Sequence, residues 1–355
     1  MTMNETLNQI GRLFQLEGQP VAYQSVAGGR INATYRAEFH QTDGRVRRYI
    51  FQRINTEVFP DPATVMRNIA QVTDHIRTHS PQERTLCFHH TASGEGFVRT
   101  ADGACWRVMD DIDSAPLFAA DSVELAAAVG SAFGRFQYLL ADFDATRLSE
   151  TIAAFHDTPK RIRTLFVHAD EDPLGRAGNI GQELAYIRAV SEKASALCVR
   201  YAQGGIPCRV THNDTKAANV LFERDTRTPV VIDLDTVMAG MAVYDFGDGA
   251  RSVAQTDGRM DSVKFCAYTK GFLSGAAGCL TREETDAFVL GTFSVTVELA
   301  VRYLDDYLTG DYYFAPHSST HNLARARSLI ALAQDIAEQE AELTQIVRAA
   351  EMACL

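Results

Sequence analysis

Residues 207–248 contain the feature that most constrains how this chain can fold: a polar loop between two short apolar stretches, followed by a carboxylate at a strand end. The loop has the pattern His-x-Asp-x-Lys-x-x-Asn over residues 212–219, and the β-branched stretch 230–232 then leads to Asp233. Sheet pairing fixes the ends of strands, so side chains placed there are held at defined positions. The pattern predicts strand, loop, strand, turn and strand, with polar side chains that can face one site.

The residue types in this stretch are those that phosphoryl transfer requires. A carboxylate such as Asp214 can orient or deprotonate an attacking hydroxyl, and Asn219 and Asp233 offer the oxygen ligands that Mg²⁺ prefers. Lys216 lies two residues past Asp214, where its ammonium could offset charge on a γ-phosphate, whereas His212 is expected to brace the loop. In the alternative interpretation the loop is only a turn and Asp233 only a strand-end cap, but the number of coinciding positions favours a catalytic site.

Length and composition limit the possible classes of protein. A chain of 355 residues is longer than one typical domain, so two lobes are expected. The net charge is −11 and no long basic run occurs, which disfavours nucleic acid or an anionic membrane as a partner. The seven cysteines are scattered and never spaced Cys-x-x-Cys, which predicts a reduced, cytoplasmic setting without a zinc site. We also find no signal-peptide pattern and no apolar segment of about 18 residues.

The apolar periodicity changes along the chain. Residues 1–110 predict a first helix that ends at Gly18, three strands at 21–27, 31–39 and 46–53, a helix at 63–77, and two short strands at 85–89 and 105–109. Residues 111–355 are mainly helical. The predicted N-terminal caps are Asp121 with Glu124, Asp157 or Thr158 before Pro159, and the capping box of Thr281 and Glu284. The predicted helices include one over 178–203, one that begins at Tyr244, one from the capping box through Leu308, and one from Asn322 to about Arg348. The predicted fold is therefore α+β and bilobal, with a small antiparallel-sheet lobe over 1–110 and a large, mainly helical lobe over 111–355. Because the pattern at 212–219 is similar to that of protein kinases, we expect a protein-kinase-like fold.

The first lobe offers several candidate nucleotide contacts. The turn with Gly28, Gly29 and Asn32 could cover phosphates, although Gly-Gly between strands is also an ordinary hairpin without a ligand. Gln52 stands on the third strand where a kinase would place a lysine, so either it hydrogen-bonds the nucleotide or a basic residue from elsewhere substitutes. Met109 and Asp110 end the last strand of the lobe, where a connector could bind adenine through its backbone; a plain strand is the alternative.

With these motifs in view, the chain resembles the N-acetylhexosamine 1-kinases, a branch of the aminoglycoside phosphotransferase-like kinases. Gln52 in place of lysine is shared with that branch. The resemblance implies ATP- and Mg²⁺-dependent phosphorylation of the anomeric 1-hydroxyl of GlcNAc or GalNAc, without indicating which sugar is preferred. The stretches that resemble the branch are 30–35, 49–55, 150–159, 211–221, 232–236, 244–248 and 302–314.

The same resemblance implies roles for individual residues. Asp214 would be the base, Asn219 and Asp233 the metal ligands, and Arg302 and Tyr313 part of the sugar site. Without the resemblance, Arg302 would be a surface ion-pair partner and Tyr313 a packing residue. Two further positions concern the substrate. Strand alternation would place Asp235 on the same face as Asp233, as an acceptor for a sugar hydroxyl, and Arg30 stands where the best-known members have histidine, so its effect on selectivity stays open.

Two rival functions remain. The first is another small-molecule kinase, acting on an aminoglycoside, a choline-like compound or an amino alcohol; Arg302, Arg325 and Arg327 favour a neutral polyol over such cations. The second is a non-catalytic pseudokinase, which the presence of all three predicted catalytic and metal-binding side chains disfavours. The expected partners are a nucleotide and a small sugar, and a monomer is favoured.

Overall fold

The computed structural model describes residues 2–26, 31–314 and 320–354, and the chain forms two compact units. Unit 1 comprises Met1–Leu117, Leu148–Ile152 and Leu221–Val237, and unit 2 comprises Phe118–Arg147, Ala153–Val220 and Met238–Leu355. The chain thus returns to unit 1 twice, which a single predicted boundary at residue 110 does not capture. The predicted class is confirmed: unit 1 is a small antiparallel sheet with helices, and unit 2 is mainly helical.

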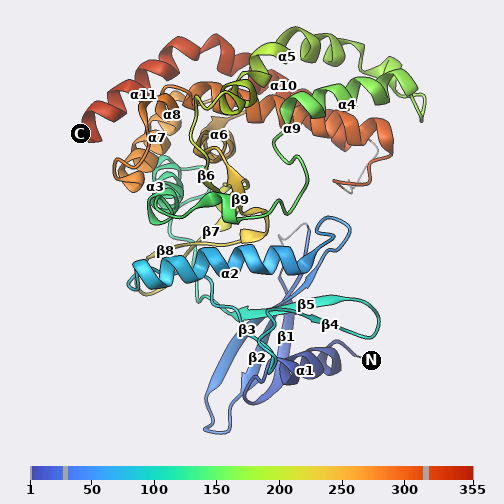
Figure 1. The fold of residues 1–355 in the computed structure, drawn as a ribbon, viewed down its shortest axis with the longest axis vertical. Helices are drawn as coiled ribbons and strands as arrows, with labels where there is room; N and C mark the ends of the chain where they lie inside the picture. The colour runs from blue at the N-terminus through green and yellow to red at the C-terminus, as the bar shows by residue number, and fades with distance from the viewer. Residues whose placement is uncertain (1, 27–30, 315–319, 355) are drawn as a thin grey trace. The chain divides into compact units, whose positions relative to one another are not determined.

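The sheet of unit 1 has five antiparallel strands in the order β1-β2-β3-β5-β4 (Figure 1). Helix α1 covers one face, where Leu7 and Ile10 pack against Phe39, Phe51 and Trp106. Burial of these side chains supplies the main stabilisation of the sheet. The helix and the first three strands were predicted at these places, but α1 ends at Leu13 and not at Gly18. The elements are α1 (Met3–Leu13), β1 (Gln19–Ser25), β2 (Ala33–His40), β3 (Val46–Ile54), β4 (Val98–Arg99) and β5 (Cys105–Asp110).

The predicted strand at residues 85–89 is wrong. Only Phe88 pairs, in an isolated bridge with Met109. The short strand beside β5 is instead β4, because the turn near Gly103 folds the chain back directly onto β5.

Helix α2 (Pro62–His79) begins at a strong N-cap. The Asp61 carboxylate accepts the N–H groups of Ala63 and Thr64, and Pro62 occupies the first turn, where a missing N–H costs nothing. The sequence of this helix contains no glutamate that could pair with a lysine of the sheet, so its polar contacts within unit 1 come from other side chains.

A hairpin and a turn complete unit 1. Strands β7 (Val220–Phe222) and β8 (Pro229–Val231) form a two-stranded sheet, and the 3₁₀ turn η4 (Leu234–Thr236) follows. Asp233, directly before this turn, has the left-handed backbone angle φ 63°. Non-glycine residues seldom adopt this conformation, although aspartate tolerates it better than most. The direction of the Asp233 side chain is therefore set by a constrained turn rather than by a strand.

Helices build most of unit 2 (Figure 1), which also contains two small two-stranded sheets. The helices are α3 (Val123–Leu139), α4 (Thr158–Glu171), α5 (Gly181–Ala202), α6 (Ala242–Val253), α7 (Ser262–Ala276), α8 (Arg282–Thr285), α9 (Phe288–Thr309), α10 (His321–Glu338) and α11 (Glu340–Cys354). The strands are β6 (Arg209–Thr211) with β9 (Met238–Gly240), and β10 (Gln255–Thr256) with β11 (Arg259–Met260).

Helices α3 and α7 are in direct backbone contact through glycines. A Cβ atom on Gly130 or Gly134 of α3 would overlap a carbonyl oxygen of α7, and one on Gly271 or Gly275 of α7 would overlap a carbonyl oxygen of α3. Both pairs are spaced four residues apart, so they lie on one face of each helix. The helices can therefore approach only because these four positions have no side chain.

Two predicted caps and the extent of the last helix need correction. Ser122, not Asp121, caps α3, and Asp121 instead binds the Lys264 ammonium. Asn322 does not begin a helix: it lies buried in α10, where its side chain donates to Asp306. The last helix is also divided, because α10 ends before a separate α11 begins. Short polar side chains serve equally well as caps and as buried hydrogen-bond partners, so the sequence alone did not separate the two roles.

The predicted start of α4 is confirmed, with Asp157 as the N-cap. The capping box of Thr281 and Glu284 also forms, but it begins the short α8, and the long helix restarts at Phe288.

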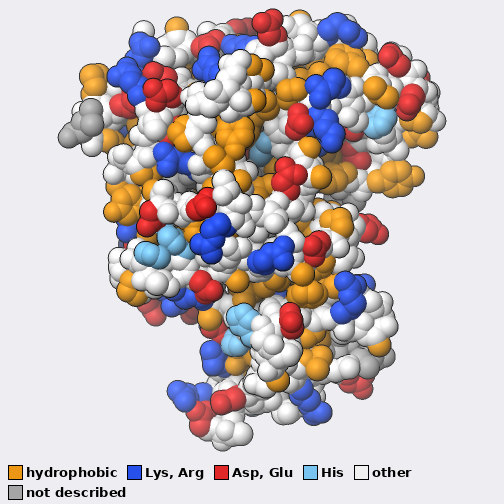
Figure 2. Space-filling view, in the orientation of Figure 1, with side chains coloured by type: hydrophobic (Ala, Val, Ile, Leu, Met, Phe, Trp, Pro, Cys, Tyr) orange, Lys and Arg blue, Asp and Glu red, His pale blue; other side chains and the backbone are white. Residues whose placement is uncertain are grey.

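Acidic and basic side chains are interspersed on the face shown in Figure 2, without a large basic patch there. All seven cysteines are free thiols. Among the described residues, none of the helices combines the length and the apolar character that crossing a membrane requires.

Candidate active site

The polar loop after β6, in unit 2, gathers three of the predicted site residues. The Oδ2 atom of Asp214 lies 2.6 Å from the Nζ atom of Lys216 and accepts a hydrogen bond of 2.9 Å from the Asn219 amide. The side chains of Asp214 and Lys216 are 31% and 41% exposed. The carboxylate is thus fixed by two donors and still accessible from outside.

A buried aspartate anchors the backbone of this loop. Both oxygens of Asp245, in α6, accept backbone N–H groups: those of His212 and Asn213, each at 2.8 Å. Gln137 donates a third hydrogen bond to the same carboxylate. Burial raises the pKa of Asp245, and the His212 ring and the two N–H groups oppose that rise only in part. This confirms the prediction that Asp245 accepts hydrogen bonds from the loop backbone.

Packing also supports the expected bracing role of His212. Its ring is fully buried and meets the rings of Phe133 and Phe136 edge to face. Its Nδ1 atom accepts the Asp214 N–H at 3.3 Å. The histidine therefore shapes the backbone on which Asp214 sits.

The donor set on this loop fits a hard cation. The Nδ2 atom of Asn219 donates to both the backbone oxygen and the carboxylate of Asp214, so Oδ1 is the atom of that amide directed elsewhere. An amide oxygen together with a carboxylate such as Asp233 is a ligand set typical of Mg²⁺. Asn219 belongs to unit 2 and Asp233 to unit 1, and their convergence on one ion stays a prediction.

In unit 1, the expectation for Asp235 rested on strand alternation, which does not apply there. Asp235 lies in the 3₁₀ turn η4 and is 2% exposed. Its Oδ1 atom pairs with Arg107 Nη1 at 2.5 Å, and its Oδ2 atom accepts a hydrogen bond of 2.6 Å from Asn32. Both oxygens of the predicted sugar ligand are therefore engaged inside unit 1.

Two predicted nucleotide contacts also make hydrogen bonds within unit 1. The amide of Asn32 donates to Asp235 and accepts the Asn55 N–H at 2.9 Å. Gln52 donates to Thr34 at 3.1 Å and accepts from Arg107 at 2.9 Å. Gly28, Gly29 and Arg30 lie outside the described residues.

Met109 and Asp110 end β5, as predicted. Met109 is buried, and the Asp110 N–H donates to the Cys87 carbonyl at 3.0 Å. The Asp110 carboxylate contacts His89 and Arg47, and the hydrogen bond from His89 is the main reason that its pKa lies below the ordinary value. The Asp110 N–H is thus engaged within unit 1, and the role of the connector in adenine binding stays a prediction.

Arg302 and Tyr313 meet in unit 2, as their shared assignment to a sugar site requires. The Arg302 Nη2 atom donates to the Tyr313 hydroxyl at 2.8 Å, and its guanidinium also lies over the Phe155 ring. Arg161 contacts the same ring. Burial, followed by the charge of Arg302, lowers the pKa of Arg161, and Glu298, 3.8 Å from Arg161, opposes the shift.

A buried pair next to this cluster was not predicted. His156 Nδ1 lies 3.0 Å from Glu298 Oε1, and Thr158 donates to Glu298 Oε2 at 2.7 Å. Burial alone would raise the pKa of Glu298, but His156, Arg161 and Thr158 outweigh it and hold the pKa below its ordinary value. The sequence showed His156 without a partner, because Glu298 follows 142 residues later.

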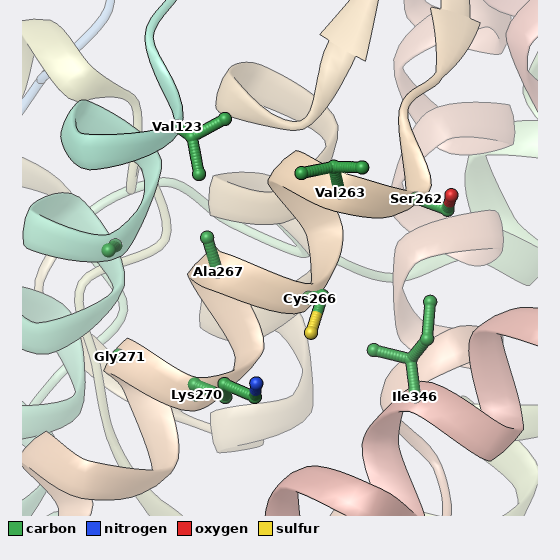
Figure 3. Close-up of a pocket in the computed structure, with 9 residues that line it drawn as sticks. Val123, Ser262, Val263, Cys266, Ala267, Lys270, Gly271 and Ile346 are labelled. Atoms are coloured by element: carbon green, nitrogen blue, oxygen red, sulfur yellow. The ribbon is translucent and has the colours of Figure 1, made fainter.

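A separate pocket of about 750 Å³ lies in unit 2 between α3, α7 and α11 (Figure 3). Its lining is largely apolar and includes none of the predicted site residues. The lining residues are Val123, Ala127, Ser262, Val263, Cys266, Ala267, Lys270, Gly271 and Ile346.

These features define a class of protein: a phosphotransferase with a kinase-like fold, in which a carboxylate is held on a loop by a lysine and an asparagine. Residues 22–276 match the phosphotransferase enzyme family (APH), and the chain belongs to this family. The predicted enzyme class is thus confirmed, as is the broader resemblance to aminoglycoside phosphotransferase-like kinases. The N-acetylhexosamine branch stays a prediction.

Solved structures of small-molecule kinases share the fold. The chain is similar to an aminoglycoside phosphotransferase from Alicyclobacillus acidocaldarius subsp. acidocaldarius, with 14% identity, a TM-score of 0.62 and 96% of both chains covered. It is also similar to the amicoumacin kinase hAmiN in complex with AMP-PNP, Ca²⁺ and Ami, with 14% identity, a TM-score of 0.59 and 96% of this chain and 94% of that chain covered. Choline kinase LicA from Streptococcus pneumoniae matches with 12% identity, a TM-score of 0.58 and 95% of this chain and 99% of that chain covered.

Proposed function

We propose that this protein transfers the γ-phosphoryl group of ATP to the anomeric 1-hydroxyl of an N-acetylhexosamine, GlcNAc or GalNAc. The observation on which the proposal rests is the accessible Asp214 carboxylate, fixed by Lys216 and Asn219 on a loop that Asp245 anchors. The choice of sugar rests on the resemblance to the N-acetylhexosamine 1-kinases in the motifs around these residues.

In the proposed reaction, Asp214 orients the sugar 1-hydroxyl and accepts its proton as the oxygen attacks phosphorus. An anomeric hydroxyl is more acidic than an ordinary alcohol, so a positioned carboxylate is a sufficient base. Lys216 is partly exposed and can exchange its contact with Asp214 for the γ-phosphate, where it would offset developing charge. Asn219 and Asp233 would hold Mg²⁺, which when bound neutralises charge on the triphosphate.

The cluster around Arg302 supports a neutral or hydrogen-bond-accepting substrate over a cationic one. Arg302 and Arg161 both contact the Phe155 ring. Glu298, 3.8 Å from Arg161, offsets one of the two charges. The other charge would repel a positively charged acceptor beside it. Of the other two arginines considered from the sequence, Arg327 pairs with Glu183 at 2.6 Å and so adds little to this repulsion.

A panel of acceptors with ATP, followed by ³¹P NMR of the product, tests the substrate assignment. An anomeric phosphate signal with GlcNAc or GalNAc is expected. A signal from a 3-phosphate or a 6-phosphate, or turnover only with amino alcohols, would reject the sugar 1-kinase and favour another small-molecule kinase of the group.

Asp214→Asn tests the catalytic residue. The variant should fold normally and lose on the order of 10²–10⁴-fold in kcat. Near-normal turnover would show that Asp214 is not the base. ADP release with and without sugar separates an active kinase from a pseudokinase.

On this proposal the chain works in the cytoplasm, as a monomer, with ATP and Mg²⁺. The amicoumacin kinase with AMP-PNP and Ca²⁺ shows that a protein of this fold binds a nucleotide analogue and a divalent cation. Size-exclusion chromatography with light scattering checks the oligomeric state.

A further inference from the structure

One face of the sheet of unit 1 has a row of polar side chains at the level of Gln52. The strand register pairs Thr34 of β2 with Gln52 of β3, and Gln52 with Arg107 of β5. Residues paired in this way on neighbouring strands lie on the same face and contact each other. Their side chains are hydrogen-bonded in sequence, from Arg107 through Gln52 to Thr34. Arg107 is therefore the basic residue that contacts Gln52, the residue at the third-strand position where a kinase would have lysine.

Arg107 is the largest fully buried side chain of the described residues, with 2% exposure. A buried cation is tolerated only when it is paired and hydrogen-bonded. Its Nη1 atom pairs with Asp235 at 2.5 Å, its Nε atom donates to Gln52, and its guanidinium lies 5.4 Å from the centre of the Phe88 ring. The charge of Arg107 is therefore directed at the turn that begins after Asp233.

Two other hydrogen bonds join the same turn to the rest of unit 1. Asn32 donates to the second oxygen of Asp235 at 2.6 Å. Asn68 of α2 donates to the Val237 carbonyl at 2.9 Å, at the end of the turn. Asp233 itself has a left-handed backbone conformation that is sterically disfavoured, so the turn depends on these contacts to keep its shape.

We propose that Arg107 is a positioning residue for phosphoryl transfer: through Asp235 it holds the turn in the shape that directs Asp233 at the metal. Arg107 acts on the metal ligand and not on the substrate. The inference rests on the proposed function, because it takes Asp233 to be a ligand of Mg²⁺.

The test measures how much Mg²⁺ strengthens nucleotide binding, without turnover. Isothermal titration calorimetry gives the Kd of AMP-PNP in EDTA and in Mg²⁺, and the ratio of the two values is the metal-dependent gain. Arg107→Met keeps an unbranched, flexible side chain of somewhat shorter length and removes its charge. It is expected to reduce the gain at least tenfold, with a smaller change in the Kd measured in EDTA.

Two further variants address folding and rescue. Arg107→Met leaves Asp235 buried without its cation, so Arg107→Met/Asp235→Asn removes both charges while the new amide can still accept from Asn32; it should melt cooperatively and show the same reduced gain. Gln52→Lys added to Arg107→Met returns an ammonium to the neighbouring strand, at the position whose side chain contacts Arg107 in the wild type. This variant should recover most of the gain, which a merely structural loss would not allow.

Arg36→Met is the matched control. Arg36 also pairs with an aspartate of unit 1, Asp111 at 3.0 Å, but that pair does not touch the turn. The metal-dependent gain of the Arg36→Met variant should therefore equal that of the wild type. An unchanged gain in folded Arg107→Met and in the double variant, or a loss of gain in Arg36→Met, would overturn the proposal.

Asp233→Ala distinguishes this proposal from the function on which it rests. If Asp233→Ala loses the gain and the Arg107 variants do not, only the positioning role fails. If Asp233→Ala keeps the gain of the wild type, the metal assignment of the proposed function fails as well.

Discussion

Asp245→Asn should separate the anchoring of the catalytic loop from the chemistry on it. In the wild type, one carboxylate oxygen accepts the Asn213 N–H, and the other accepts the His212 N–H and the Gln137 amide. An asparagine has only one side-chain oxygen, so in either orientation its NH₂ group faces at least one backbone N–H. The substitution therefore leaves a buried donor without an acceptor.

The expected loss follows from this count. One buried unsatisfied donor costs about 1–3 kcal/mol. The neutral amide regains part of this, because burial of the carboxylate is itself unfavourable and raises the pKa of Asp245. A net loss of about 1–2 kcal/mol corresponds to a fall in Tm of roughly 2–8 °C for a unit of this size. Displacement of Asp214 by up to about 1 Å should lower kcat by on the order of 10²-fold.

Thermal denaturation followed by circular dichroism gives the first quantity, and steady-state kinetics well below the Tm gives the second. Asp261→Asn is the matched control: Asp261 caps α7, where asparagine serves about equally well, so both Tm and kcat should stay near the wild-type values. A wild-type Tm in Asp245→Asn would refute the hydrogen-bond count. A lowered Tm with unchanged kcat would refute the link between the loop backbone and Asp214.

Three further outcomes are expected. Gly134→Ala should destabilise the protein by about 2 kcal/mol or more, because the new methyl overlaps the Phe272 carbonyl, whereas Gly178→Ala, which meets nothing, should not; urea denaturation compares the two. The lowered pKa of Glu298 means that its contribution to stability is present above the pKa of the unfolded chain, near 4.5, and is lost as pH falls through the folded value; Glu298→Gln should therefore cost about 1–3 kcal/mol at pH 7 and progressively less toward pH 3. A constant difference across that range would contradict the role of the charge. Removal of divalent cations by EDTA should abolish turnover, and Mg²⁺ should restore it; turnover that persists in EDTA would count against the proposed metal.

Elements with local signals were predictable. The first helix, the strands β1 to β3 and the Asp157 cap depend on periodicity, turn residues and capping side chains within a few positions of one another. The anchoring of the catalytic loop by Asp245 was also predicted, because Asp245 lies within the same stretch of chemistry. Such features can be predicted without knowing which distant residues they contact.

Contacts between distant residues were not predictable in this way. Arg107 is a single arginine between apolar residues of β5, and its partner Asp235 follows 128 residues later. The one available signal was the question left open at Gln52, since a missing lysine suggested a basic residue elsewhere. Strand alternation did not apply to Asp235, because the left-handed backbone at Asp233 ends the extended conformation there. A local sequence pattern does not specify such a reversal.

The return of residues Leu221–Val237 to unit 1 has a consequence for biosynthesis. A nascent chain that has emerged only through Leu117 contains Arg107 but not yet Asp235, so folding at that point would bury an unpaired cation. The interior of unit 1 is therefore complete only after more than half of the polypeptide has left the ribosome. The fragment that ends at Leu117, expressed alone, should not form a stable domain.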